Sequence, residues 1–195
     1  MATPTDRVCF SLPEWVAEHR ATYLPTDDIA QRMAFVVDAA RRNVDAGTGG
    51  PFAAAVFERV SGRLVALGVN RVPVEQLSML HAEMVALALA QRACGSYDLG
   101  AAGLREHELF TSVEPCAMCL GGIAWAGVTR VVCGATDADA RQIGFDEGPK
   151  PTDWTGALRE RGIEVIEGVG REPARAVLEA YRLRGGTLYN GRRGR

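Results

Sequence analysis

Two short segments of the sequence carry side chains that could hold a metal ion and move protons. The first reads His81-Ala82-Glu83, and the second, residues 115–119, reads PCAMC. Two thiolates and an imidazole are ligands that zinc prefers, and three protein ligands leave a fourth position open for water. Zinc lowers the pKa of such a water to near neutrality and makes it a nucleophile. Glu83, two residues after the histidine, could carry protons to and from that water.

Each part of this set has an ordinary alternative when it is taken alone. A CxxC pair can be a redox motif, although such motifs normally follow the first strand of a small domain. A closed structural zinc site needs four ligands, and Cys94 and Cys133 are available, but neither belongs to a second CxxC pair. A single histidine is more often a cap or core residue. The combination favours a catalytic site in which His81, Cys116 and Cys119 bind one zinc ion per chain.

The elements that would position these residues alternate between strands and helices. Short apolar runs predict strands at 52–57, 64–69, 108–111, 129–136 and 161–169. Periodic or continuous apolar segments predict helices at about 13–19, 27–46, 81–94, from 115 onward, and 172–185. Residues 136–156 are polar and are predicted to be loop. This order predicts a three-layer α/β/α sandwich whose mixed sheet of about five strands begins with an antiparallel hairpin and continues with parallel strands.

The length of 195 residues and the hydrophobic content of 47% fit one globular domain. Residues 1–25 are predicted to be an N-terminal extension whose Trp15 and Tyr23 pack on the main domain, and no role is assigned to it. Residues 26–195 are predicted to be the catalytic domain, which ends in a tail at 185–195.

The chain shows no secretory signal and no apolar run long enough to cross a membrane. With five cysteines, an odd number, it is therefore expected in the reducing cytoplasm, with free or metal-bound thiols. The net charge is −2, and the basic residues cluster only at the terminus, at Arg192, Arg193 and Arg195. We therefore expect no nucleic-acid partner and no membrane partner.

The pairing of HAE with PCxxC resembles the cytidine-deaminase-like zinc deaminase superfamily, whose known signature is H-x-E…P-C-x-x-C. The resemblance covers about Asp28 to Asn190 and includes GPFAAAVF, HAE and TSVEPCAMCLGGIAWAGV. It implies a three-layer α/β/α fold, hydrolytic deamination, and assembly for which we expect a homodimer. It also implies that His81, Cys116 and Cys119 bind zinc and that Glu83 is the proton shuttle.

Several substrates remain open within this superfamily. Its short cytidine deaminases carry cysteine at the position of His81, so they are disfavoured. Residues 137–150, DADARQIGFDEGPK, are similar to the guanine deaminase branch, where an acidic side chain contacts the base; Asp146 and Glu147 are both candidates. We therefore expect water to attack C2 of guanine, giving xanthine and ammonia. A guanosine or other nucleoside deaminase, a cytosine or triazine-amine deaminase, and a zinc-stabilised binding module are the alternatives.

Other residues could contact the base. A carboxylate would accept hydrogen bonds from N1 and N2 of guanine, and the amide of Asn70 could serve a ring acceptor and a ring donor together. Backbone N–H groups near Ala82 and Cys116 could orient the tetrahedral intermediate. The tail segment GGTLYNG could close over the site, and the room it leaves would separate a base from a nucleoside. The candidates for lining or covering the base are Phe52, Trp125, Phe145 and Tyr189.

Overall fold

A five-stranded sheet forms the middle of the molecule in a computed structural model that describes residues 6–191. Its strands are β1 (Ala53–Glu58), β2 (Leu64–Val69), β3 (His107–Val113), β4 (Arg130–Ala135) and β5 (Glu164–Ile166), in the order β2-β1-β3-β4-β5. Strand β1 is antiparallel to β2 and to β3, whereas β3–β4 and β4–β5 are parallel pairs. The prediction of a mixed sheet of about five strands, opening with an antiparallel hairpin, is confirmed.

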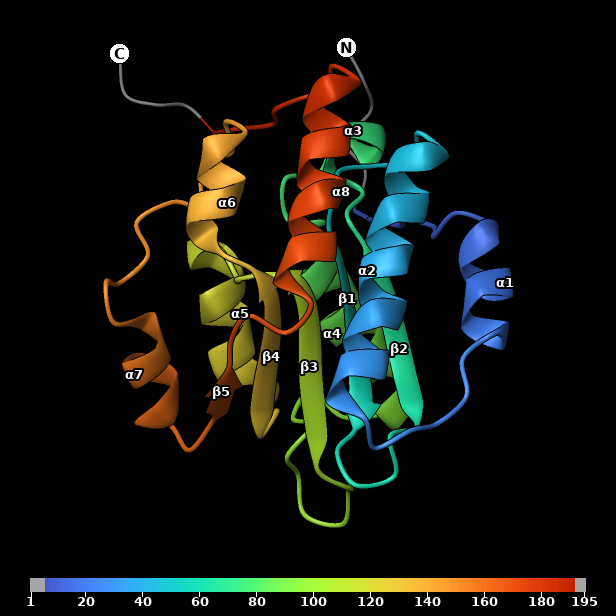
Figure 1. Ribbon diagram of the computed structural model, residues 1–195. Helices are drawn as coiled ribbons and strands as arrows, with labels where there is room; N and C mark the ends of the chain where they lie inside the picture. Colours follow the sequence, from blue (N-terminus) through green and yellow to red (C-terminus); the bar gives the residue numbers. More distant parts are fainter. Residues whose placement is uncertain (1–5, 192–195) are drawn as a thin grey trace.

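Helices cover both faces of this sheet. They are α1 (Trp15–Ala21), α2 (Ile29–Asp45), α3 (Val72–Glu75), α4 (Ala82–Cys94), α5 (Ala117–Ala126), α6 (Asp137–Gln142), α7 (Trp154–Arg159) and α8 (Arg171–Leu183). Figure 1 shows α2 and α8 in front of the sheet and α4 and α5 behind it. Neighbouring residues of β3 point to opposite sides, so Phe110 joins the core under α2 and α8 while Leu109 joins the core under α4 and α5. The three-layer α/β/α sandwich is thereby confirmed.

Local sequence signals explain where the long helix α2 begins and ends. The carboxylate of Asp28 accepts a hydrogen bond from the backbone N–H of Ala30 at 2.8 Å, as an N-cap residue does. Gly47 follows the helix with a φ of +63°, a conformation that glycine adopts without steric strain. Met33, Val36 and Ala40, which follow one another at spacings of three and four residues along this helix, are fully buried.

The polar stretch 136–156, predicted to be loop, contains α6 and the first residues of α7. Helix α6 begins with a capping box in which Thr136 and Asp139 each accept a hydrogen bond from the other's backbone N–H. A six-residue helix is too short to establish a periodic apolar stripe, so the cap was the only signal for it. Helix α3, with four residues, was missed for the same reason.

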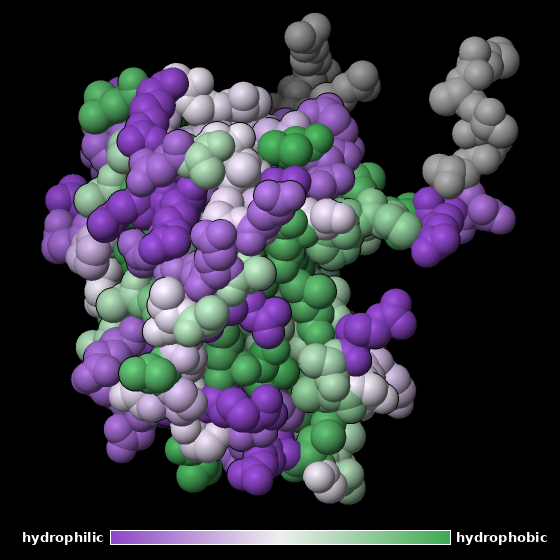
Figure 2. All heavy atoms as spheres, turned by 90° about the vertical axis from the view of Figure 1, so that its right-hand side faces the viewer, coloured by the Kyte–Doolittle hydropathy of each residue, from purple (hydrophilic) through white to green (hydrophobic). Residues whose placement is uncertain are grey.

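The N-terminal segment packs on the domain as expected. The indole N–H of Trp15 donates to Thr48 Oγ1 at 3.1 Å, and the hydroxyl of Tyr23 donates to the carbonyl of Gly62 at 2.8 Å. Helix α1 lies beside the start of the edge strand β2, with which it lines a shallow groove. Figure 2, which faces this side of the molecule, shows a strip of hydrophobic surface between hydrophilic regions. None of the helices within residues 6–191 has the length and apolar run that a bilayer crossing requires.

Candidate active site

Three strands end at the same edge of the sheet, and the candidate site lies there. Because β1 is antiparallel to both β2 and β3, those two strands run in the same direction, and β4 follows β3 in parallel. Open α/β sheets commonly bind ligands outside the carboxyl ends of their strands. Asn70 follows β2 directly, Cys116 comes three residues after β3, and Glu147 lies in the connection that follows β4.

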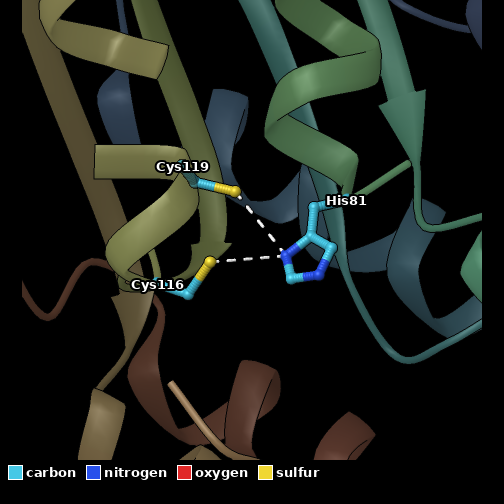
Figure 3. Close-up of side chains that lie close together, drawn as sticks. All are labelled: His81, Cys116 and Cys119. Carbon is cyan, nitrogen blue, oxygen red and sulfur yellow. Dashed lines mark hydrogen bonds between the residues drawn. The ribbon is translucent and has the colours of Figure 1, made fainter. Parts of the chain in front are cut away.

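The three predicted zinc ligands converge at this edge. His81 is the N-cap of α4, Cys116 is the N-cap of α5, and Cys119 lies in the first turn of α5. Nδ1 of His81 lies 3.4 Å from Sγ of Cys116 and 3.6 Å from Sγ of Cys119, as Figure 3 shows. For a tetrahedral zinc ion with Zn–S of about 2.3 Å and Zn–N of about 2.0 Å, such ligand atoms lie about 3.5 Å apart. The nitrogen and the two sulfurs, all within 4.8 Å of one another, therefore fit one zinc ion.

The thiols are prepared for metal binding by their surroundings. Hydrogen bonds with Cys119 and with His81 together lower the pKa of Cys116 to about 4, against the effect of burial. The same Cys116–Cys119 contact, together with burial, raises the pKa of Cys119. One thiolate therefore exists at neutral pH before metal is added, and zinc displaces the second proton when it binds.

Glu83 is the second residue of α4 and is almost fully buried, with 6% of its surface exposed. Burial and the negative charge of Cys116, opposed by His81, together raise the pKa of its carboxyl to about 7. A group whose pKa lies near the working pH can both accept and return a proton. Glu83 also lines the cavity that contains the zinc ligands, which places it where a proton shuttle is needed.

A cavity of about 290 Å³ surrounds this group and is near the lower end of the size range of small-molecule sites. The predicted residues that line it are Phe52, Asn70, His81, Glu83, Cys116, Phe145, Asp146, Glu147 and Tyr189. Asn190 and Gly191, from the tail segment that was expected to close over the site, line it too, whereas sequence reasoning missed Ser78, Glu114, Ala117, Met118, Gly148 and Pro149. Most of these residues are sequence neighbours of a motif residue, so their position next to it could have indicated them. Ser78, in the connection between α3 and α4, has no motif residue beside it.

Two predicted contact residues lie outside this lining. Trp125 is 81% exposed, which corrects the expectation that it lines or covers the base from within its own chain. It lies seven residues beyond Met118, which does line the cavity, and so stands about 10 Å further along α5. Ala82 is fully buried, and as the first residue of α4 it could offer only its backbone N–H; that role stays a prediction.

The structure distinguishes the two acidic candidates of the connection after β4. Glu147 is 6% exposed, and its backbone carbonyl accepts a hydrogen bond from Ala117 N at the start of α5. Burial raises the pKa of the Glu147 carboxyl to about 8, and the negative charges of Cys116 and Glu83 add to the shift. Asp146 is more exposed, and its carboxylate accepts from the N–H of Gly148. Of the two, Glu147 is the buried acid facing the zinc ligands.

Two polar atoms of the lining residues are buried without a hydrogen-bond partner among residues 6–191. They are Nδ2 of Asn70 and the hydroxyl of Tyr189. The other end of the Asn70 amide is occupied, since Oδ1 accepts from the N–H of Val72 at 3.2 Å. Asn70 therefore has an unpaired donor, and the expectation that its amide serves a ring acceptor and a ring donor together stays a prediction. Because buried polar groups in proteins are nearly always paired, these two atoms indicate a polar ligand.

The tail reaches the cavity and is tied to the loop that carries Glu147. The amide of Asn190 donates to the carbonyl of Gly144 at 2.8 Å and accepts from the N–H of Asp146 at 2.9 Å. The ring of Tyr189 lies 5.0 Å from that of Phe145, between centroids. Aromatic surface therefore lines the part of the cavity to which the tail contributes.

Known proteins share both the zinc-ligand region and the fold. Residues 26–135 match the family described as "Cytidine and deoxycytidylate deaminase zinc-binding region". The chain is 39% identical to the guanine deaminase of Bacillus subtilis (strain 168) over 111 residues, which cover 57% of this chain and 67% of the relative. It matches the solved structure of guanine deaminase from Nitrosomonas europaea with a TM-score of 0.88 and 43% identity over 93% of this chain and 100% of that one. A structure of the protein NE0047 with 2,6-diaminopurine gives a TM-score of 0.88 and 45% identity over 95% of this chain and 97% of that one.

Proposed function

Because the chain belongs to the cytidine and deoxycytidylate deaminase zinc-binding family, we propose that it is a hydrolase that converts guanine to xanthine and ammonia. The observation that carries the proposal is that two buried acids, Glu83 and Glu147, line one cavity together with two of the three candidate zinc ligands, His81 and Cys116. The similarity to two guanine deaminases, one compared by sequence and one by structure, supports guanine as the substrate.

The chemistry of the cavity wall fits the edge of a guanine ring. Guanine presents N–H groups at N1 and at its 2-amino group, and the carboxyl oxygens of Glu147 can accept hydrogen bonds from such neighbouring donors. Nδ2 of Asn70 can donate to a ring acceptor. A site that leaves a buried polar group unpaired with the wrong ligand discriminates strongly against that ligand. Phe52, Phe145 and Tyr189 supply aromatic surface against which a planar base can pack.

Zinc, when held by His81, Cys116 and Cys119, supplies a Lewis acid that makes water nucleophilic near neutral pH. Glu83 accepts a proton from the attacking water and delivers it to a ring nitrogen of guanine. As the bond between C2 and the amine breaks, Glu83 takes the second proton of the former water from the oxygen now bound to C2 and passes it to the departing nitrogen. Overall, guanine and water are consumed, and xanthine and ammonia are formed. Glu147 orients the ring so that C2 faces the water.

Ammonia release from a panel of amines tests the proposal. The zinc-loaded protein is incubated with guanine, guanosine, cytosine, cytidine, adenine and triazine amines, and ammonia is measured for each. We expect the highest kcat/KM for guanine. Faster release from guanosine would reassign the substrate to a nucleoside, and no release from any compound would favour a zinc-stabilised binding module.

We extend the proposal to a homodimer in the cytoplasm. The exposed indole of Trp125 supports the dimer, because aromatic residues and methionine are enriched at protein interfaces and Met118 is also exposed on the same side of α5. All five cysteines are free thiols, which suits a reducing compartment. Light scattering should give twice the chain mass, and Trp125→Asp should give a monomer; a monomeric wild-type protein would overturn the dimer.

A further inference from the structure

One fully buried amide outside every motif connects two segments of the cavity wall. Asn43, near the end of α2, has no exposed surface. Its Nδ2 donates to the carbonyl of Gly50 at 2.8 Å and to the carbonyl of Asn70 at 2.9 Å. Its Oδ1 accepts from Oγ1 of Thr48 at 2.8 Å. Both donors of the amide are therefore used to join two stretches of backbone that are 20 residues apart in sequence.

Both of these carbonyls belong to residues that shape the cavity. Asn70 supplies the unpaired Nδ2 that faces the ligand space. A methyl group added at Gly50 would come within 2.4 Å of the Tyr189 hydroxyl and 3.0 Å of Asn70 Oδ1. The absence of a side chain at Gly50 therefore leaves the space that these two groups occupy. The separation of Gly50 and Asn70 thus sets the positions of two groups that would meet the base, and the Asn43 amide fixes that separation.

The N-terminal segment holds the outer end of this connection. Oγ1 of Thr48 donates to Asn43 and accepts from the indole N–H of Trp15 in α1. A continuous row of hydrogen bonds therefore runs from Trp15 through Thr48 and Asn43 to the backbone of Asn70. Each buried bond of such a network restricts the others, so the geometry at the inner end depends on the outer members.

We propose that Asn43 is a positioning residue for the base, and that Thr48 and Trp15 hold its amide in place. The inference rests on the proposed function, in which Asn70 donates to the substrate. Loss of the Asn43 amide releases the backbone of Asn70 and weakens binding of the base. The zinc ligands come from other segments, so zinc content stays at the wild-type level.

Graded substitutions along this row test the inference. Asn43→Asp keeps the shape but turns an oxygen toward two carbonyl oxygens, and we expect the KM for guanine to rise about tenfold, as loss of a buried hydrogen bond implies, with a much smaller change in kcat. Thr48→Val and Trp15→Phe remove hydrogen bonds farther from Asn70 and serve as the test if Asn43→Asp folds poorly. We expect them to raise KM by about threefold and about twofold. Gln31→Glu makes the same chemical change at an exposed position of α2 and is expected to leave KM unchanged.

Coupling to Asn70→Ala separates positioning from a general effect on folding. If Asn43 acts through Asn70, then Asn43→Asp or Thr48→Val causes no further rise in KM in the Asn70→Ala background, although each still lowers the melting temperature. Equal rises in KM in both backgrounds would overturn the inference.

The affinity for 8-azaguanine, measured by calorimetry on the same variants, shows whether Asn43 and Asn70 are coupled in binding a base, and it needs no catalytic turnover. A protein that binds 8-azaguanine but releases no ammonia from guanine would contradict the proposed function, and the coupling between Asn43 and Asn70 could still be measured. A wild-type protein that binds no base at all would overturn both.

Discussion

Buried acids lie near both ends of strand β3, and they differ in whether they form salt bridges. Glu108, at the amino end, has no exposed surface and forms salt bridges with Arg32 and with Arg130. Glu83 and Glu147, at the carboxyl end, are each 6% exposed and form no salt bridge with another residue of the 6–191 range.

This contrast distinguishes an acid that is paired within the fold from acids that could exchange protons. The Glu108 carboxylate lies between two guanidinium groups, and its loss would leave buried positive charge unpaired. An acid buried without such a partner has a raised pKa and can exchange protons near neutral pH. The comparison therefore predicts that substitutions at the two ends of β3 separate activity from stability.

The largest effect is expected for Glu83→Gln. The amide keeps the size of the side chain but cannot move protons, so kcat for guanine should fall by about a thousandfold. Zinc content, measured by atomic absorption, should stay close to wild type, and the melting temperature should not fall, because no salt bridge is lost. A Gln variant that retains most of the activity would remove Glu83 from the chemistry.

Glu108→Gln should show the reverse pattern. It leaves Arg32 buried without its charge partner and should lower the free energy of unfolding by about 3 kcal/mol in urea titration. For the fraction that remains folded, KM and kcat should match wild type. Leu183→Gln, at an exposed position in α8, is the control and should change the unfolding free energy little. Loss of activity without loss of stability in Glu108→Gln would contradict the division.

A smaller effect is expected in the pH dependence of stability of the metal-free protein. The folded pKa of Glu147 is about 8, above the ordinary value of 4.5, so the folded state holds a proton that the unfolded state releases. Its ionisation therefore destabilises the fold increasingly from pH 4.5 to about 8. Glu147→Gln should become progressively more stable than wild type across that window, as chemical unfolding at each pH would show. A constant difference would mean that Glu147 is not held in an apolar, unpaired environment.

The sequence predicted that His81, Cys116 and Cys119 come together, that Glu83 lies beside them, and that the sheet is mixed, because each of these features depends on local signals. HAE and PCxxC place ligands at helix starts, and apolar runs mark the strands. The helices α3, α6 and α7 were missed because four to six residues cannot display a helical period.

What could not be predicted concerns spatial relations between segments. The exposure of Trp125 depends on how far along α5 it stands from the cavity, and the choice between Asp146 and Glu147 depends on which side chain the loop buries. The role of Asn43 was invisible because its partners are backbone carbonyls, which every residue carries.

Titration of the metal-free protein with zinc, with ammonia release from guanine followed at each addition, is the decisive test of zinc-dependent deamination. We expect no release without zinc, a rise in rate in proportion to added metal, and a plateau at about one zinc ion per chain. Full activity in the metal-free protein, or no ammonia from guanine at one zinc per chain, would contradict it.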